Sequence, residues 1–422
     1  MKDLAKKMVI LGAGGVVLGF ILLVLVYALP KAAMKEHASQ SAMDWYGEGA
    51  WPILVNDYNS STLDNFTDSL MLSIAVYDSG EPILKQVAKA YYALQEDVLP
   101  HESLYRYLQE DAQYDMTYRG EDYAKYWHGY LVVLKPLLML LSYSDLRVLN
   151  ICMLVLLTGY VFVLMENEIA KGAGSFFLLA YIFIMPLTVF LCLDMANMSY
   201  VTLLALIVLL KKKRYLCRGN NILLYFMAVG MLTSYVDFLT YPMVSLGIPL
   251  VTYLVLLIGK EETASVSKKG ILSIVFWGMG YIGMWASKWV VAGLITGDNI
   301  LRDALSSVKT RSGMRVEENH FEARFEAIGN NVEILCQGIY GKILFVFMAY
   351  VFGTLLWNVL KKKAGRKCLW SFLVVALIPF GWLFVTSQHA AMHAWFTYRN
   401  LIVSIYALGM LAYSTNIIAQ KH

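Results

Sequence analysis

The sequence predicts an all-α polytopic membrane protein of about ten transmembrane helices, with a large, partly helical first extracytoplasmic loop. Three observations predict this fold. Hydrophobic residues make up 58% of the 422 residues and charged residues only 16%, which leaves too little polar surface for a water-soluble protein of this length. Apolar runs long enough to cross a bilayer recur along the chain, and short basic clusters separate many of them.

Charge and cysteine content exclude several classes of protein. The net charge is only +4, and the basic residues sit in short clusters between apolar runs, so we expect a lipid bilayer and no nucleic acid as partner. The cysteines have no paired spacing, which supports neither a disulfide framework nor a zinc ribbon. They are Cys152, Cys192, Cys217, Cys336 and Cys368.

The first apolar run, residues 8–29, predicts a signal-anchor span. At 1.5 Å per residue this run crosses the roughly 30 Å hydrocarbon core of a bilayer. A cleaved signal peptide has a shorter apolar core. Lys2, Lys6 and Lys7 precede the run and place the N-terminus in the cytoplasm.

The distribution of basic residues indicates which later runs cross. If all of about eleven apolar runs crossed, the basic clusters at 211–218 and 361–367 would lie outside, against the positive-inside rule. The run 129–142 is short and carries Lys135-Pro136 at its centre, where a charge and a lost hydrogen bond are both costly. We therefore predict an interfacial helix there, on the outer face. The chain 1–422 is then one membrane domain with both termini cytoplasmic. Residues 148–422 carry nine further spans.

The outer segment 30–147 holds more than half of the 31 acidic residues, interleaved with aromatic residues, so we expect it to be folded. Asp64 and Asp68 stand four positions apart and share one face if the stretch is helical. Paired carboxylates serve as a base and a metal ligand. The alternative interpretation is that Asp64 or Thr62 caps a surface helix.

Other ionisable residues fall at span ends on the same side. Asp194 and Asn197 lie at the outer end of the fourth crossing, and Asp237 lies in an outer turn, where helix capping is the alternative. The outer loop 297–337 mixes basic and acidic residues and favours solvated charged helices. Lys288 lies within an apolar run, where burial is expensive unless an anion meets it.

The stretch 387–400 combines two histidines and a cation with aromatic residues at the entrance to the last span. Arg399, beside Tyr398, could supply a fork of donors to a phosphate. His389 and His393 are one helical turn apart and could donate a proton or bind a metal. The alternative is an aromatic-belt anchor with a snorkelling arginine.

In order and topology, the first half of the chain resembles the GT-C superfamily of integral-membrane glycosyltransferases. A first span, a large outer loop with an early acidic residue, a non-crossing outer helix and an acidic motif at the outer end of the fourth span carry the likeness. The matching residues are Asp64 with Asp68 in the base region, Asp194-Met-Ala-Asn197 as the second acidic motif, and the stretch from Tyr126-Trp-His128-Gly-Tyr130 through Lys135-Pro136 to Leu146-Arg147 as the outer helix. Asn197 stands where some members have a second acid.

The resemblance implies a bacterial plasma-membrane enzyme. Its donor would be a sugar on a polyprenyl phosphate and its acceptor an extracytoplasmic glycan or cell-envelope polymer. Asp64 would be the general base of an inverting transfer, and Arg399, with Lys288, His389 and His393, would meet the donor phosphate. Further outer-face candidates are Asp237, His128, Lys135 and Tyr398. No cofactor is implied with certainty, and a divalent metal stays open. A transporter or lipid-linked-sugar flippase and an O-antigen-type polymerase are the alternatives.

Overall fold

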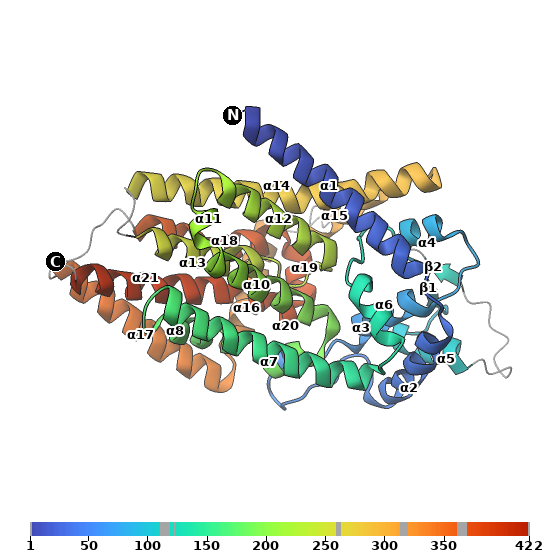
Figure 1. The fold of residues 1–422 in the computed structure, drawn as a ribbon. Helices are drawn as coiled ribbons and strands as arrows, with labels where there is room; N and C mark the ends of the chain where they lie inside the picture. The colour runs from blue at the N-terminus through green and yellow to red at the C-terminus, as the bar shows by residue number, and fades with distance from the viewer. Residues whose placement is uncertain are drawn as a thin grey trace.

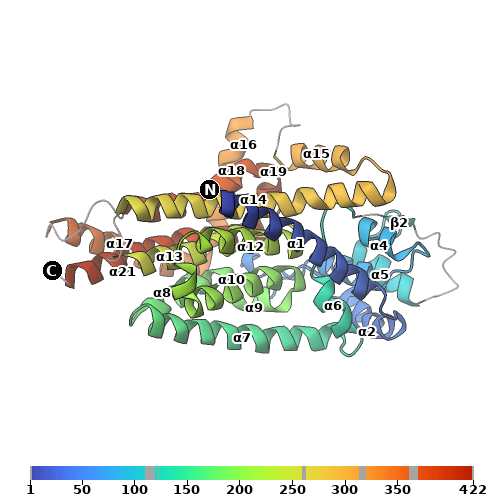
Figure 2. The ribbon, with the colours of Figure 1, turned by 45° about the horizontal axis from the view of Figure 1, so that its top comes forward.

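The computed structural model describes residues 2–109, 119–121, 123–258, 263–312, 320–360 and 369–420. These residues form an elongated bundle of helices with a smaller, mixed body at one end (Figure 1). Figure 2 shows the same two parts from a second direction. The acidic outer segment and the apolar runs of the sequence therefore correspond to different parts of the molecule.

The mixed body, which we call the polar body, is built from residues 32–138. Its helices are α2 (Ala32–Glu48), α3 (Asn65–Val76), α4 (Ile83–Lys89), α5 (Pro100–Gln109) and α6 (Leu131–Leu138), with the 3-10 turn η1 (Asn59–Ser61). Strands β1 (Tyr92–Leu94) and β2 (Arg119–Glu121) pair antiparallel, with Ala93 opposite Gly120. The expectation that this segment is folded and partly helical agrees with these elements.

Five of the described helices are long and apolar enough to cross a membrane. They are α1 (Lys2–Tyr27), α7 (Tyr143–Glu168), α10 (Leu193–Lys211), α14 (Thr263–Thr296) and α17 (Gly338–Leu360). This is consistent with an all-α membrane protein. The prediction of about ten crossings depends on the shorter helices as well.

Several shorter apolar helices lie between the long ones. They are α8 (Ala173–Tyr181) continued by η2 (Ile182–Ile184), α12 (Asn221–Val236), α13 (Met243–Leu257) and α18 (Leu369–Val385). The remaining elements are α9 (Pro186–Leu191), α11 (Lys213–Leu216), α15 (Ile300–Arg311), α16 (His320–Leu335), α19 (Ser387–Met392), α20 (Ala394–Thr397), η3 (Tyr398–Leu401) and α21 (Ile402–Gln420). Within the predicted outer loop 297–337, the described residues form α15 and α16.

The helices α12 and α14 pack at close range through two glycines. A Cβ on Gly230 would collide with the carbonyl oxygen of Trp277, and a Cβ on Gly280 would collide with that of Met227. Small residues at such positions let two backbones approach, which is how membrane helices gain packing energy without a hydrophobic driving force.

The helix in the predicted interfacial stretch 129–142 is shorter than expected. Only Leu131–Leu138 is helical, which is about 12 Å of helix and less than half of a hydrocarbon core. The next helix, α7, begins at Tyr143, inside the predicted outer loop. Ser142 and Asp145 form a reciprocal capping box at its start, which fixes this boundary.

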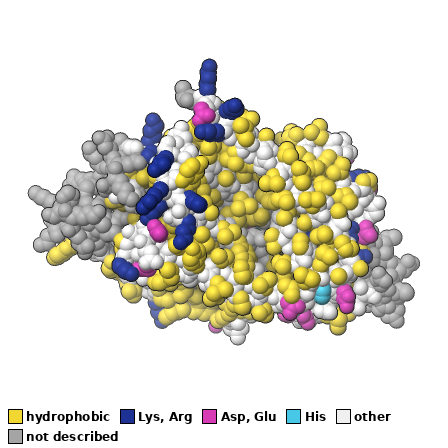
Figure 3. Space-filling model, viewed as in Figure 1, with side chains coloured by type: hydrophobic (Ala, Val, Ile, Leu, Met, Phe, Trp, Pro, Cys, Tyr) yellow, Lys and Arg dark blue, Asp and Glu magenta, His cyan; other side chains and the backbone are white. Residues whose placement is uncertain are grey.

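The surface fits a bilayer. In the view of Figure 3, hydrophobic side chains form a broad continuous area, while Lys and Arg gather mainly at the left and top. Large apolar side chains are exposed on several candidate spans, including Leu156 of α7, Leu294 of α14 and Phe345 of α17. Contiguous exposed apolar area of this extent is typical of lipid contact.

Candidate functional site

Asp64 lies in the interior, directly before α3. Its Oδ1 accepts a hydrogen bond from the Thr67 backbone N–H at 2.9 Å, and its Oδ2 accepts one from the Thr67 hydroxyl at 2.7 Å. The side chain therefore caps the helix, as the alternative interpretation of the sequence predicts. Asp64 is only 2% exposed, however, so this is not an ordinary surface cap.

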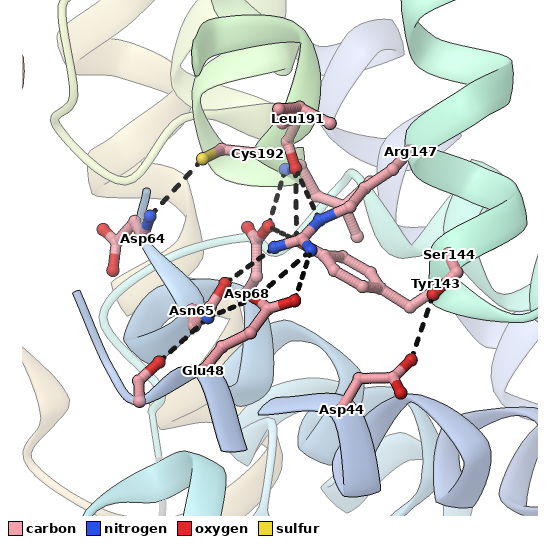
Figure 4. Close-up of polar contacts among 12 residues, drawn as sticks. Asp44, Glu48, Asp64, Asn65, Asp68, Tyr143, Ser144, Arg147, Leu191 and Cys192 are labelled. Carbon is pink, nitrogen blue, oxygen red and sulfur yellow. Dashed lines mark hydrogen bonds and ion pairs between the residues drawn. The ribbon is translucent and has the colours of Figure 1, made fainter. Parts of the chain in front are cut away.

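Asp68 follows on the first turn of α3 and faces the start of α10 (Figure 4). Its two oxygens accept backbone N–H bonds from Leu193 at 2.9 Å and Asp194 at 3.0 Å. The hydroxyl of Tyr143, the first residue of α7, donates to the same carboxylate. A carboxylate at a helix N-terminus satisfies free amides and meets the positive end of the helix dipole. Asp68 thereby joins the polar body to the candidate spans α7 and α10 by hydrogen bonds.

Asp194 completes a buried cluster of three acids, which we call the acidic centre: Asp64, Asp68 and Asp194. Asp194 is 1% exposed, and neither carboxylate oxygen has a hydrogen-bond partner among the described residues. The charge that acts on it most strongly is Asp64. A buried carboxylate without a hydrogen bond of good geometry is costly, so Asp194 is a candidate for binding a group of the substrate.

The surroundings change the acidity of the loop carboxyls. Burial raises the pKa of Asp64 to about 7, the Asp68 charge adds to this rise, and the Thr67 hydrogen bonds oppose it. Burial also raises the pKa of Asp68, while the bond from Tyr143 and the amides of α10 oppose that rise. A carboxyl that titrates near neutrality accepts and returns a proton with little driving-force penalty, as a general base requires.

Arg147, on the second turn of α7, is a functional candidate that the sequence interpretation used only as a boundary. Its guanidinium donates to Leu191 O at 3.1 Å and Asn65 Oδ1 at 2.8 Å, and pairs with Glu48 at 3.3 Å (Figure 4). It also lies over the Tyr143 ring. The Arg147 side chain is 13% exposed and that of Glu48 38%. The i, i+4 spacing of Tyr143 and Arg147 on the outermost turns of a span was the available signal.

Arg399, in η3, is fully buried. Its Nε donates to Ile184 O at 2.7 Å, and its Nη1 and Nη2 donate to Trp395 O and Ser60 O, each at 2.9 Å. The guanidinium of Arg399 lies over the Tyr398 ring. The positive charge of Arg399 also interacts with Asp194. The structure thus brings Arg399 to the acidic centre, but with each of its nitrogens already bonded to a carbonyl.

The other predicted cations and histidines lie in separate places. His389 bonds to Leu239 O at 2.9 Å, and its ring lies 4.8 Å from that of His393. Lys288 is buried over the Trp127 ring and donates to Val87 O at 2.8 Å.

His128 contacts Tyr123 O and Tyr130, and burial lowers its pKa to about 3. It is therefore neutral at physiological pH.

The remaining polar candidates make hydrogen bonds within the fold. Asp237 caps the end of α12 and accepts two bonds from Thr240, while its Oδ2 has no partner among the described residues. Lys135 donates to Ala75 O at 2.5 Å and lies over the Tyr27 ring. Asn197 contacts Val236 O at 3.4 Å.

An apolar groove of about 300 Å³ adjoins the acidic centre. Residues of α3, α6, α7, α10 and α12 line it, among them Met71, Leu134, Leu146, Leu193 and Val236. Leu193 is also the residue whose amide bonds Asp68. Asn150, Asn197 and Tyr200 add polar groups to an otherwise apolar wall. The groove therefore has a mainly apolar lining and shares one residue, Leu193, with the surroundings of Asp68.

The described residues contain one group with metal-ligand geometry, formed by Asp68, Cys192 and Asp194, whose ligand atoms lie within 4.8 Å of one another. Both Asp68 oxygens already accept protein hydrogen bonds, and the Cys192 sulfur accepts one from the Asp64 amide. Mg²⁺ and Mn²⁺ prefer oxygen ligands, and only Asp194 is free to provide them. The group fits a resident divalent ion poorly.

Comparisons with models of known protein families, with curated proteins and with solved structures find no match to this chain. The function must therefore be argued from the site itself.

Proposed function

We propose that this protein is a membrane glycosyltransferase that moves a sugar from a polyprenyl-phosphate donor to an extracytoplasmic glycan or cell-envelope acceptor. The observation that carries the proposal is the acidic centre. The polar body supplies Asp64 and Asp68, the candidate span α10 supplies Asp194, and Asp64 has a pKa of about 7. Such a cluster is expensive to bury, and proton transfer at a reacting hydroxyl gives it a use.

In this proposal Asp64 is the general base. An acceptor hydroxyl attacks the anomeric carbon of the donor sugar, and its proton passes to the Asp64 carboxylate as the new carbon–oxygen bond forms. The bond from the anomeric carbon to the phosphate oxygen breaks, and the electron pair leaves with the lipid phosphate. A single displacement of this kind inverts the configuration at the sugar.

Positive charge near the leaving phosphate lowers the barrier, because negative charge grows there in the transition state. Arg147 is the better placed of the two nearby arginines, since its partner Glu48 is partly exposed and their contact is long, 3.3 Å. A phosphate that replaced Glu48 would receive the donors of Arg147 Nη1, while Nε and Nη2 stay bonded to Leu191 O and Asn65 Oδ1 and hold the guanidinium in place. Arg399 contributes through its charge, because its nitrogens are bonded to carbonyls.

The apolar groove explains why such an enzyme needs many membrane helices. A polyprenyl chain is insoluble in water, and the groove offers it an apolar wall that includes Leu193, whose amide donates to Asp68. A transporter would need a passage for its substrate. It would not need a base with a pKa near 7 at one end of a span. The acidic centre thus favours chemistry over transport.

The test is transfer of a radiolabelled sugar from polyprenyl-phosphate donors by purified, reconstituted protein. We expect Asp64→Asn to lower the rate roughly 10²- to 10⁴-fold, the range that general-base catalysis contributes. Asp194→Asn should lower it as well. Asp97→Asn is the matched control, because Asp97 is an exposed residue of the same polar body and asparagine tolerates its φ of 60°.

Two outcomes would overturn the proposal. One is wild-type transfer by Asp64→Asn protein that is correctly inserted. The other is a wild-type protein that transfers no sugar from a panel of polyprenyl-phosphate sugars but joins lipid-linked glycans into longer chains. That result would identify a polymerase.

A further inference from the structure

The loop between α2 and α3 exposes a run of large apolar side chains. Trp51, Ile53, Leu54 and Val55 are each between 40% and 50% exposed. They lie within the polar body, whose core side chains, such as Trp45 and Leu72, are fully buried. Aromatic residues, Trp51 and Tyr58, stand at the two ends of the run, as in segments that sit at a membrane–water interface.

A fixed backbone frame holds these side chains outward. Ile53 forms a β-bridge with Thr62, and the Leu54 amide donates to Ser61 O at 3.2 Å. The buried hydroxyl of Ser61 bonds the loop from inside, to Val55 O and Tyr58 O. The exposure is therefore built into the fold and is not a consequence of a loose segment.

The loop lies against the beginning of a candidate span. The Tyr58 hydroxyl accepts a bond from the Ile339 amide at 3.0 Å, and the Tyr58 ring lies 6.1 Å from that of Tyr340. Gly338, the first residue of α17, has no room for a Cβ beside Tyr58. Ile339, Phe345 and Val346 continue the exposed apolar surface along α17. The loop thus adjoins surface that faces lipid if α17 crosses the membrane.

The same loop is mechanically joined to the acidic centre. The Trp51 ring stacks on Phe66 of α3 at 5.3 Å, two residues after Asp64. The Leu63 amide donates to Pro52 O at 2.9 Å, and Arg399 donates to Ser60 O. A change in the position of the loop would therefore move the cap of α3.

We propose that residues 51–55 insert shallowly into the leaflet that borders the polar body, and that the lipid surface holds the Asp64 end of α3 at the height of the headgroups. The occupant of this apolar surface is the bilayer itself, because Tyr58 joins the loop to the start of α17, where apolar side chains are exposed. The depth is shallow, since Asn56 and Asp57 are exposed at the end of the run.

The test uses an environment-sensitive fluorophore on single cysteines in full-length protein whose native cysteines are replaced, reconstituted in phosphatidylcholine vesicles. Leu54→Cys is compared with Leu99→Cys. Both leucines are 40% exposed and both belong to the polar body, but Leu99 precedes α5, far from α17 in Figure 1. We expect a blue-shifted emission at position 54, quenched at least threefold more by nitroxide-labelled lipids than emission at position 99.

Equal lipid quenching at the two positions would overturn the proposal. So would a blue shift at position 54 without lipid quenching, because that result means that protein covers the loop. A second readout guards against misfolding of the labelled variants: iodide in the water should quench position 99 more than position 54. None of these measurements uses sugar transfer, so the proposal stands or falls separately from the enzymatic function.

Discussion

The side chain of Asp64 does two things that usually exclude each other. It accepts both hydrogen bonds that Thr67 can give, which favours the carboxylate, yet burial raises its pKa to about 7. Burial prevails, so the protonated form of Asp64 is favoured more than that of a carboxyl in water. The sequence indicated the acid and its partner Asp68, because four-residue spacing can be seen without a structure. Burial of this pair depends on contacts with α10 and was not predictable from spacing.

The Thr67 hydroxyl gives a prediction at this scale. Replacement Thr67→Val removes a hydrogen bond to the ionised form of Asp64, so the pKa of Asp64 should rise. A base works in its ionised form, so the rate of sugar transfer should increase with pH around a midpoint near 7 in the wild type. In Thr67→Val the midpoint should lie at higher pH. The measurement is the pH dependence of kcat/KM.

Thr67→Ser keeps the hydroxyl and is the matched control, with a midpoint that stays near the wild-type value. A Thr67→Val profile that loses rate evenly at all pH values, with no displacement of its midpoint, would show that Thr67 acts on the structure of α3 and not on the acidity of Asp64.

Among the elements, α3 is held at both ends. Asp64 caps its first turn, and Lys135 donates to Ala75 O in its last turn. Lys31 donates to Tyr77 O, just past the helix, at 2.9 Å. Lysine at the carboxyl end of a helix satisfies free carbonyls and meets the negative end of the dipole. The charge of Lys135 in the run 129–142 predicted a non-crossing helix, but its partner is in another helix, 60 residues earlier.

Lys135 is also the basis of a stability prediction. Lys135→Ala leaves Ala75 O without its donor and opens a cavity, so at pH 8.5 we expect a loss of roughly 2 to 4 kcal/mol. Burial lowers the pKa of Lys135 from 10.5 to about 7. Between these two pKa values Lys135 is protonated in the unfolded chain and largely deprotonated in the folded protein. The stability of the wild type should therefore increase as pH rises from about 7 toward 10.

Thermal unfolding in detergent, followed by circular dichroism at several pH values, checks both parts. Lys85→Ala removes a lysine from an exposed pair with Glu81 and should change stability by less than about 0.5 kcal/mol. If Lys135→Ala retained the same increase with pH as the wild type, another group would have to be responsible for it.

Over the whole molecule, Arg399 shows why the site could be predicted only in part. Its three nitrogens bond carbonyls of Ser60, Ile184 and Trp395, and of these Ser60 and Ile184 are distant in sequence. Order and charge along the chain predicted that Asp64, Asp194 and Arg399 belong to one side of the membrane. The order and charge of residues along the chain do not tell which carbonyls a guanidinium contacts in the folded protein. The phosphate-binding role assigned to Arg399 stays a prediction, and Arg147 is a second candidate that only the packed structure reveals.

The topology gives the last prediction, because the number of crossings depends on one interrupted segment. Residues 173–191 form α8, η2 and α9, and the helix breaks where Met185 adopts a φ of 55° before Pro186. Broken helices can cross a bilayer when neighbouring protein covers the free backbone groups. If this segment crosses between α7 and α10, exposed Leu140 and exposed Lys212 lie on opposite sides of the membrane. Each single cysteine is introduced into protein whose native cysteines are replaced, and the protein is expressed in intact cells. A membrane-impermeant maleimide should then label Leu140→Cys from outside and Lys212→Cys only after lysis. Labelling of both from the same side would mean that 173–191 does not cross, and the positive-inside argument that places the basic clusters in the cytoplasm would fail with it.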